Sequence, residues 1–374
     1  MPTSQIQTAV DAIANQQISN QFGTERYALL FMPGTYGSAT SPLNFQVGYY
    51  TTVAGLGSLP DDVVVNGSID VYNQCDGSNN CVALTNFWRS LSNLSINVTN
   101  PTFGCHTGEF WAVSQAAPLR RVQVNGQVTL FDYCTQPSFA SGGFIADSQF
   151  ATSQIISGSQ QQWVTRNSNI DSWTNGVWNQ VFSGVVGAPA QCFPGGACGG
   201  PYTTLATSPV TREEPYLYID ANGKYRVFVP AVQRDSSGAS WAAGSTPGSS
   251  ISIDNFFVAQ PTDSAARINL ALLLGKNLIL SPGVYNLESA IIVPYPDTVV
   301  LGLGFPTLIP QNGNASMRVL SSRGVEVSGI IFDAGPQNSP VLLQAGTILS
   351  LLGDPGAADD PSAYQDVLDR KSVV

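Results

Sequence analysis

The sequence predicts an all-β protein, a right-handed parallel β-helix in two tandem coils, of which we expect the second to be truncated. Three observations support this class. One unit near the start of the chain recurs about 250 residues later, apolar runs of three to six residues alternate with polar turns, and no long helical periodicity interrupts them. Each turn of a β-helix contributes such short strands, and their inward Val, Ile and Leu side chains stack on the turns above and below.

The recurring unit joins a short helix, an apolar strand, a Pro-Gly turn and a second strand that ends in glycines. The stretch LLFMPGTYGS at 29–38 matches LILSPGVYNL at 278–287, and AGLG at 54–57 matches LGLG at 301–304. A helical pattern precedes each copy, QTAVDAIANQQ in the first and DSAARINLALLLG in the second. Because these features recur in the same order, we interpret them as the entry to two coils of the same kind.

A β-sandwich or jelly roll is the alternative fold, and it would favour hairpins with tight Asn-Gly or Asp-Gly loops. Only residues 216–229 have the pattern of such a hairpin, and a stretch rich in Ser, Gly and Ala follows at 234–250. We therefore expect a first β-helix domain with a terminal hairpin at 1–233, a linker at 234–250, and a second, incomplete β-helix domain at 251–374.

Charge and composition favour a neutral polymer as the partner. Only 11% of the 374 residues are charged, the net charge is −10, and no run of Lys and Arg is present, so we expect no binding to nucleic acid. The same net charge would repel a uronic acid polymer such as pectate at long range. No apolar run is long enough to span a membrane. We expect a monomer that uses no cofactor and no metal.

The sequons and cysteines point to a secreted protein. Four sequons stand at Asn66, Asn93, Asn97 and Asn314, although the N-terminus shows no signal peptide. Six cysteines permit 15 pairings, and free thiols or a metal site are the alternatives to disulfides. The chain has a single histidine, His106, which argues against zinc. The tight spacings favour Cys75 with Cys81 and Cys192 with Cys198, which leaves Cys105 with Cys134.

Several acidic residues stand among strands and aromatic residues, where a groove could form. Hydrolysis of a glycosidic bond normally needs one protonated carboxyl group and one ionised carboxylate. For each candidate the alternative is a turn-capping or solvated role. The apolar run GIIF before Asp333 could remove water from its carboxyl group and raise its pKa. The candidate catalytic residues are Asp333, Glu326, Asp147 and Asp171.

Residues 157–180 combine amides, one arginine and three tryptophans. Amides and guanidinium groups form paired hydrogen bonds with sugar hydroxyls, and indole faces stack on the apolar faces of pyranose rings. The alternative is an amide ladder inside the coil, with the tryptophans as packing residues. The candidate substrate-binding residues are Gln161, Gln162, Trp163, Arg166, Trp173 and Trp178.

The repeated entry units resemble the start of the pectate-lyase-like superfamily, in which a helix caps a β-helix and a PGxY motif closes its first turn. Two such coils in tandem are similar to glycoside hydrolase family 55. That resemblance implies paired β-helices, a substrate site between them and exo-acting hydrolysis of β-1,3-glucan. In these tandem glucanases the catalytic acid belongs to the second coil, so a truncated second coil puts that acid in doubt here. The other functions considered are a non-catalytic glycan-binding scaffold and a polysaccharide lyase that acts on uronic acid polymers.

Overall fold

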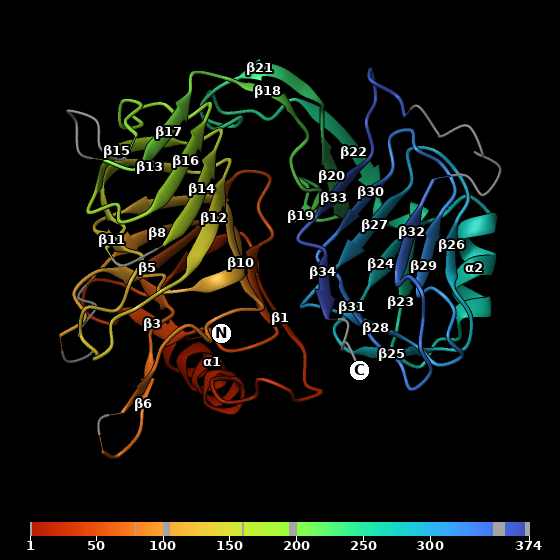
Figure 1. The fold of residues 1–374 in the computed structure, drawn as a ribbon, viewed down its shortest axis with the longest axis horizontal. Helices are drawn as coiled ribbons and strands as arrows, with labels where there is room; N and C mark the ends of the chain where they lie inside the picture. The colour runs from red at the N-terminus through yellow and green to blue at the C-terminus, as the bar shows by residue number, and fades with distance from the viewer. Residues whose placement is uncertain are drawn as a thin grey trace.

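The computed structural model describes residues 2–78, 80–99, 105–158, 161–193, 200–346 and 356–370. Two parallel β-helices lie side by side, with a small antiparallel sheet between them (Figure 1). The predicted fold class is confirmed: apart from the short antiparallel pair of β6 and β7, neighbouring strands within each coil are parallel, and those of the connecting segment are antiparallel.

The first β-helix begins with one helix, and its strands stack in the order β1-β4-β8-β10-β12-β14-β16-β17 along one sheet. Its elements are α1 (Thr3–Gln17), β1 (Tyr27–Phe31), β2 (Gly34–Tyr36), β3 (Leu43–Gln46), β4 (Thr51–Gly55), β5 (Val63–Asp70), β6 (Gln74–Cys75), β7 (Cys81–Val82), β8 (Arg89–Val98), β9 (Glu109–Phe110), β10 (Ser114–Asn125), β11 (Val128–Thr129), β12 (Gly142–Ala146), β13 (Gln149–Ile156), β14 (Gln162–Arg166), β15 (Asn169–Thr174), β16 (Asn179–Ser183) and β17 (Tyr202–Leu205).

The core of this coil is built from columns of aliphatic side chains in register. Leu91 of β8 lies opposite Val53 of β4 on one side and Leu119 of β10 on the other, and all three are buried. Helix α1 covers the open end of the column, and its buried Gln17 donates from Nε2 to the carbonyl of Tyr49 at 2.7 Å. The helix therefore supplies partners for backbone groups at the first strand edge.

Five strands connect the two coils among the described residues. They are β18 (Ser208–Thr211), β19 (Tyr216–Ile219), β20 (Tyr225–Pro230), β21 (Gln233–Ser236) and, at the entry to the second coil, β22 (Gly248–Ser252). The predicted hairpin is confirmed, since β19 and β20 pair antiparallel from Tyr216 opposite Phe228 to Ile219 opposite Tyr225. Strand β22 joins that hairpin, and β18 pairs with β21.

Most residues of the segment at 234–250 are exposed, but Ala239 and Trp241 are buried. It contains most of β21 and the start of β22. Between them Trp241 is 3% exposed, and its indole N–H donates to the carbonyl of Asp147 at 2.7 Å. Where the domain boundary lies stays a prediction.

The second β-helix has three parallel sheets, in the orders β23-β24-β27-β30-β33, β25-β28-β31-β34 and β26-β29-β32. Its elements are β23 (Phe256–Ala259), α2 (Ala265–Leu273), β24 (Asn277–Leu280), β25 (Val284–Leu287), β26 (Ile291–Val293), β27 (Val299–Gly302), β28 (Thr307–Pro310), β29 (Met317–Val319), β30 (Glu326–Ser328), β31 (Ile331–Asp333), β32 (Leu343–Ala345), β33 (Ala363–Gln365) and β34 (Leu368–Arg370).

The repeated Pro-Gly turn has the same geometry in both coils. Gly34 and Gly283 each have φ = +151°, a conformation that side chains rarely adopt. Two residues further on, Tyr36 donates from Oη to the carbonyl of Met32 at 2.8 Å, and Tyr285 does the same to Ser281 at 3.0 Å. The sequence repeat is therefore a repeat of one hydrogen-bonded turn.

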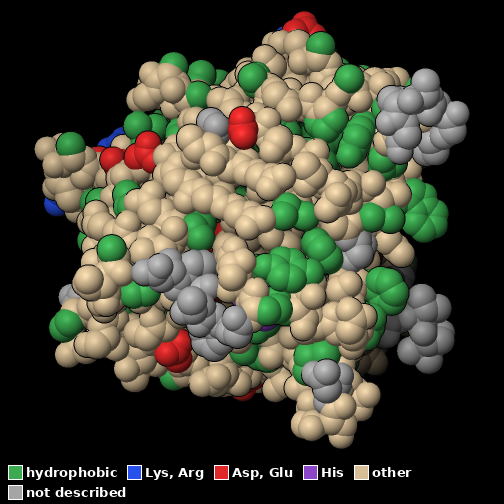
Figure 2. Space-filling view, turned by 90° about the vertical axis from the view of Figure 1, so that its left-hand side faces the viewer, with side chains coloured by type: hydrophobic (Ala, Val, Ile, Leu, Met, Phe, Trp, Pro, Cys, Tyr) green, Lys and Arg blue, Asp and Glu red, His purple; other side chains and the backbone are tan. Residues whose placement is uncertain are grey.

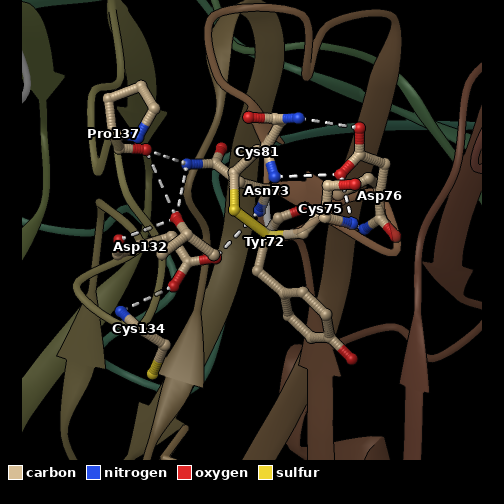
Figure 3. The surroundings of a disulfide bond; sticks show 12 residues. Tyr72, Asn73, Cys75, Asp76, Cys81, Asp132, Cys134 and Pro137 are labelled. Atoms are coloured by element: carbon tan, nitrogen blue, oxygen red, sulfur yellow. Dashed lines mark hydrogen bonds between the residues drawn. A yellow bond between two sulfur atoms is a disulfide. The ribbon is translucent and has the colours of Figure 1, made fainter.

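Two of the three predicted disulfides are present, Cys75–Cys81 and Cys105–Cys134. Figure 3 shows the first of them beside Asp132, which accepts backbone N–H bonds from Asn73 and Cys134, each at 3.0 Å. The pairing of Cys192 with Cys198 cannot be described, because Cys198 lies outside the described residues.

Candidate active site between the two β-helices

An arginine of the first coil reaches across to the second. Arg120 of β10 donates from Nε and Nη2 to the two carboxylate oxygens of Asp366, at 2.7 and 2.8 Å. Asp366 lies in the turn between β33 and β34. Its neighbours Glu213 and Glu214 come from the segment before the hairpin, with oxygens 3.7 Å from Nη1 and 3.5 Å from Nε of the same arginine. Three carboxyl groups thus converge on one guanidinium group.

A second arginine stands beside the first because of strand register. Arg120, Ala146 and Arg166 occupy one row on β10, β12 and β14. Arg166 donates from Nη2 to Glu213 at 2.7 Å. The ring of Phe144 lies 4.7 Å from the guanidinium carbon of Arg120 and 5.5 Å from that of Arg166. The aromatic ring therefore positions both cations by cation–π attraction.

These groups border a cavity of about 70 Å³ between the coils. Its apolar lining includes Leu56 of the first coil and Leu301 and Phe305 of the second. Apolar walls weaken the solvation of charged groups, so electrostatic interactions inside the cavity are stronger than in water. The polar side chains that line it are Asn93, Arg120, Arg121, Asp147, Glu213, Glu214, Tyr216 and Asp366, together with three hydroxyl side chains, Thr52, Ser90 and Ser92.

Burial raises the pKa values of two carboxyl groups in this cavity to different extents. The pKa of Glu214 is raised to about 8, first because burial disfavours its charged form and then because Asp366 lies near, while Arg120 opposes the rise. The pKa of Asp147 is raised to about 6 by burial, and Arg121 opposes that shift from 3.1 Å. At neutral pH the site therefore holds a protonated Glu214 close to an arginine-bound Asp366.

The two predicted carboxyl groups of the second coil also lie at the interface, each with its own arginine. Glu326 is 1% exposed, and its Oε1 is 2.7 Å from Nε of Arg212. Burial raises the pKa of Glu326 to about 7, with Arg212 acting against the shift. Asp333 pairs with Arg370 at 2.7 Å, and Arg370 also donates to the hydroxyl of Tyr50 at 2.5 Å.

The structure brings only part of the predicted site together. Asp147 lines the cavity and Arg166 lies beside it. Asp171 is exposed on β15 and lines no part of this cavity. The predicted sugar-binding role of two tryptophans is wrong, because Trp163 and Trp173 are 1% and 7% exposed within the core of the first coil.

The remaining predicted residues lie on the surface. Gln161, Gln162 and Trp178 are exposed near the starts of β14 and β16.

Sequence reasoning missed Arg120, Glu213, Glu214 and Asp366. A signal was present for the two glutamates, since they stand as consecutive carboxyl groups in TREEP immediately before the hairpin. Nothing marked Asp366 or Arg120, because their pairing joins positions 246 residues apart.

One other group of possible metal ligands exists among the described residues, His106, Asp132 and Cys134. The sulfur of Cys134 is bonded to Cys105, so it offers no thiolate. Asp132 already accepts two backbone N–H groups and lies 3.0 Å from Nε2 of His106. We therefore interpret this cluster as a hydrogen-bond network that holds neighbouring loops together.

Comparison with known proteins agrees with this architecture. A family model described as the LAM55 pectate lyase-like domain matches residues 256–372. The matched range contains Glu326, Asp333 and Asp366, while Arg120 and the tandem glutamates precede it.

An exo-β-1,3-glucanase of Streptomyces sp. strain SirexAA-E is 46% identical over 369 residues, which make up 98% of this chain and 57% of the glucanase. The structure of sacteLam55A from Streptomyces sp. SirexAA-E is similar with a TM-score of 0.87 and 45% identity, over 97% of this chain and 62% of that one. A variant of sacteLam55A in complex with glucose gives the same values.

The chain spans less than two thirds of the length of these relatives. The resemblance to the pectate-lyase-like superfamily, and within it to glycoside hydrolase family 55, is confirmed by the LAM55 domain and by these relatives.

Proposed function

We propose that this protein binds β-1,3-glucan between its two β-helices and hydrolyses it. The observation that carries the proposal is the presence of two carboxyl groups in one cavity, a protonated Glu214 with a pKa of about 8 and an Asp366 that is bound by Arg120. Glycoside hydrolases need this combination of one acid and one base or nucleophile. The glucanase relative, 46% identical, supports the choice of substrate.

The geometry supports a role for each group. Oxygens of Glu214 and Asp366 lie 3.5 and 2.7 Å from the same Nε atom of Arg120, so these two oxygens are at most 6.2 Å apart. Glu214 would donate its proton to the glycosidic oxygen that leaves. Asp366 would act on the anomeric carbon, directly or through a water molecule, and Arg120 would orient its carboxylate.

Glu326 is a second candidate for the acid. It is almost fully buried, its pKa is about 7, and neither of its carboxylate oxygens has a hydrogen-bond partner of good geometry. A protonated carboxyl group in this condition could donate to a bound sugar. Glu326→Gln and Glu214→Gln, compared in one assay, would distinguish the two assignments.

The test is incubation of the full chain with laminarin, with reducing ends measured over time. We expect release of glucose from the wild type and at least a hundredfold loss for Glu214→Gln, since general acid catalysis contributes roughly 10²–10⁴-fold. Asp254→Asn, a change on the exposed turn before β23, is the control and should leave the rate unchanged. Full activity of Glu214→Gln and loss for Glu326→Gln would move the acid to Glu326.

The alternative functions give different results. A lyase would produce unsaturated, ultraviolet-absorbing ends from polygalacturonate, whereas a scaffold would bind glucan and turn over neither polymer. Figure 2 shows a face of the first β-helix on which few side chains are charged and most of the surface is uncharged. This surface and the net charge of −10 favour a neutral glycan over polygalacturonate or nucleic acid.

We infer that the protein is secreted and works as a monomer. The disulfides Cys75–Cys81 and Cys105–Cys134 support an oxidising compartment. No helix within the described ranges is long and apolar enough to cross a membrane. Among the four sequons, Asn93 is 1% exposed and donates to two backbone carbonyls, so it cannot carry a glycan in the folded chain.

A further inference from the structure

The first β-helix carries a surface suited to sugar outside the interface cavity. We propose that Trp178, with Gln161, Gln162 and Asn179, forms a glucan-binding site at the edge of the β14–β16 sheet. The ligand class, a neutral β-linked glucan, rests on the function proposed above. None of these four residues lines the cavity between the coils.

Strand pairing brings these side chains together. Trp178 immediately precedes β16, and its indole-bearing side chain is 56% exposed. The N–H of the next residue, Asn179, donates to the carbonyl of Gln161 at 2.9 Å, and Asn179 lies opposite Gln162 in the parallel register. Three exposed amide side chains therefore come from the same sheet edge as one exposed indole.

The loop that presents the indole is held by the coil below it. Asn175 has φ = +56°, and Gly176 lies so close to Tyr202 that a Cβ atom there would be 2.8 Å from the ring. Only glycine allows this approach. After the loop, Gln180 is fully buried and its N–H donates to the carbonyl of Pro201 at 3.0 Å. A platform anchored in this way loses little conformational entropy when a ligand binds.

The chemistry of the surface indicates the kind of ligand. An indole face stacks on the C–H face of a pyranose ring, and amides both donate to and accept from sugar hydroxyls. Residues 161–165 and 175–180 contain no charged side chain, and the guanidinium group of Arg166 is directed to Glu213. Nothing on this surface would neutralise a uronate or a phosphate, which leaves a neutral glycan as the partner.

The position of the surface predicts its role. Gln162 and Arg166 are the two ends of β14, so the amide lies about 13 Å from the arginine beside the cavity, at roughly 3.3 Å per strand residue. Val164 lies between them on the same face and is 39% exposed. A glucan chain bound at Trp178 would be held alongside the interface. The site should therefore raise affinity for long chains and leave short oligosaccharides unaffected.

Affinity electrophoresis through gels that contain laminarin tests the site without relying on turnover. We expect Trp178→Ala to weaken binding roughly five- to tenfold, which corresponds to about 1–1.4 kcal/mol. Trp178→Phe should retain part of the affinity, because a smaller aromatic face remains. Tyr295→Ala is the control, since Tyr295 is also an exposed aromatic residue, at 43%, but lies in the second β-helix between β26 and β27, and it should bind like the wild type.

Each result has a defined meaning. Equal binding by wild type and Trp178→Ala overturns the site, whether or not laminarin is hydrolysed, and so does absence of any laminarin binding by the wild type. Binding that depends on Trp178 without hydrolysis supports the site and overturns the enzymatic function. Loss of binding by Tyr295→Ala to the same extent would also overturn the proposal, because the effect would not be specific to this surface.

Discussion

Arg120 of the first β-helix and Asp366 of the second share two hydrogen bonds, at 2.7 and 2.8 Å, and so connect the two coils through a bidentate ion pair. Bidentate geometry is the strongest form of this interaction. The arginine side chain is 8% exposed and also lies near Glu213 and Glu214. Any change at Arg120 therefore affects three carboxyl groups at once.

Replacing Arg120 should destabilise the protein strongly. In Arg120→Leu the buried carboxyl groups lose their main cation, and breaking a buried pair from one side costs about 3–5 kcal/mol. The measurement is the denaturant midpoint of unfolding. Arg323→Leu is the control, because Arg323 is 52% exposed in its pair with Asp359 and solvent screens the attraction, so the midpoint should change little. Equal midpoints for the two variants would show that the buried interface pair stabilises the protein no more than the exposed pair does.

The raised pKa of Glu214 predicts how stability depends on pH. In the folded chain this group keeps its proton up to about pH 8, whereas its ordinary pKa is 4.5. The unfolded chain therefore releases a proton that the folded chain retains. The contribution of Glu214 to the free energy of unfolding is fully present below pH 4.5. It falls as pH rises towards 8, by at most about 1.4 kcal/mol per pH unit.

Glu214→Gln should remove this contribution, because glutamine resembles the protonated acid and cannot ionise. Relative to the wild type, the variant should gain stability steadily between pH 5 and pH 8, as read from melting temperatures across that range. Glu288→Gln, at an exposed position, should give a constant difference. A constant difference for Glu214→Gln as well would mean that Glu214 is ionised in the folded protein at neutral pH.

The fold was predictable because its signals are local. The Pro-Gly turn needs glycine at φ = +151°, and its tyrosine bonds to a carbonyl four residues before it, so the motif can be read within ten residues. Short Val, Ile and Leu runs between polar turns likewise follow from the stacking of each strand on its neighbours. Each turn of the coil repeats these local patterns in the sequence, so the fold can be predicted from them.

The site was harder to predict because its contacts are remote. Arg166 and Asp147 were identified from their local setting, but Asp366 acts through an arginine 246 positions away. The composition of residues 157–180 predicts the same sugar-binding role for all three tryptophans, because a tryptophan in the core and one on the surface have the same local sequence pattern. Trp163 is buried by strand alternation and Trp178 is exposed by its loop, and only the register separates them.

The two tryptophans give a direct test of that separation. Trp163→Ala removes a side chain that is 1% exposed in the core, and loss of a buried aromatic residue costs about 3–5 kcal/mol. Trp178→Ala alters an exposed side chain, for which changes usually stay within about 0.5 kcal/mol. Denaturant unfolding of both variants measures the difference. Comparable losses would place the indole of Trp178 in the packed structure and remove it from the surface.

The two disulfides should contribute unequally, because they close loops of different length. Cys75–Cys81 joins residues 6 apart and Cys105–Cys134 joins residues 29 apart. In the chain-entropy view the shorter loop stabilises by roughly 2.3 kcal/mol and the longer by roughly 3.5 kcal/mol. Unfolding of the double variants Cys75→Ala/Cys81→Ala and Cys105→Ala/Cys134→Ala measures each contribution separately. A larger loss for the shorter loop would show that native contacts near Asp76, which accepts the N–H groups of Ser78 and Asn80, outweigh chain entropy.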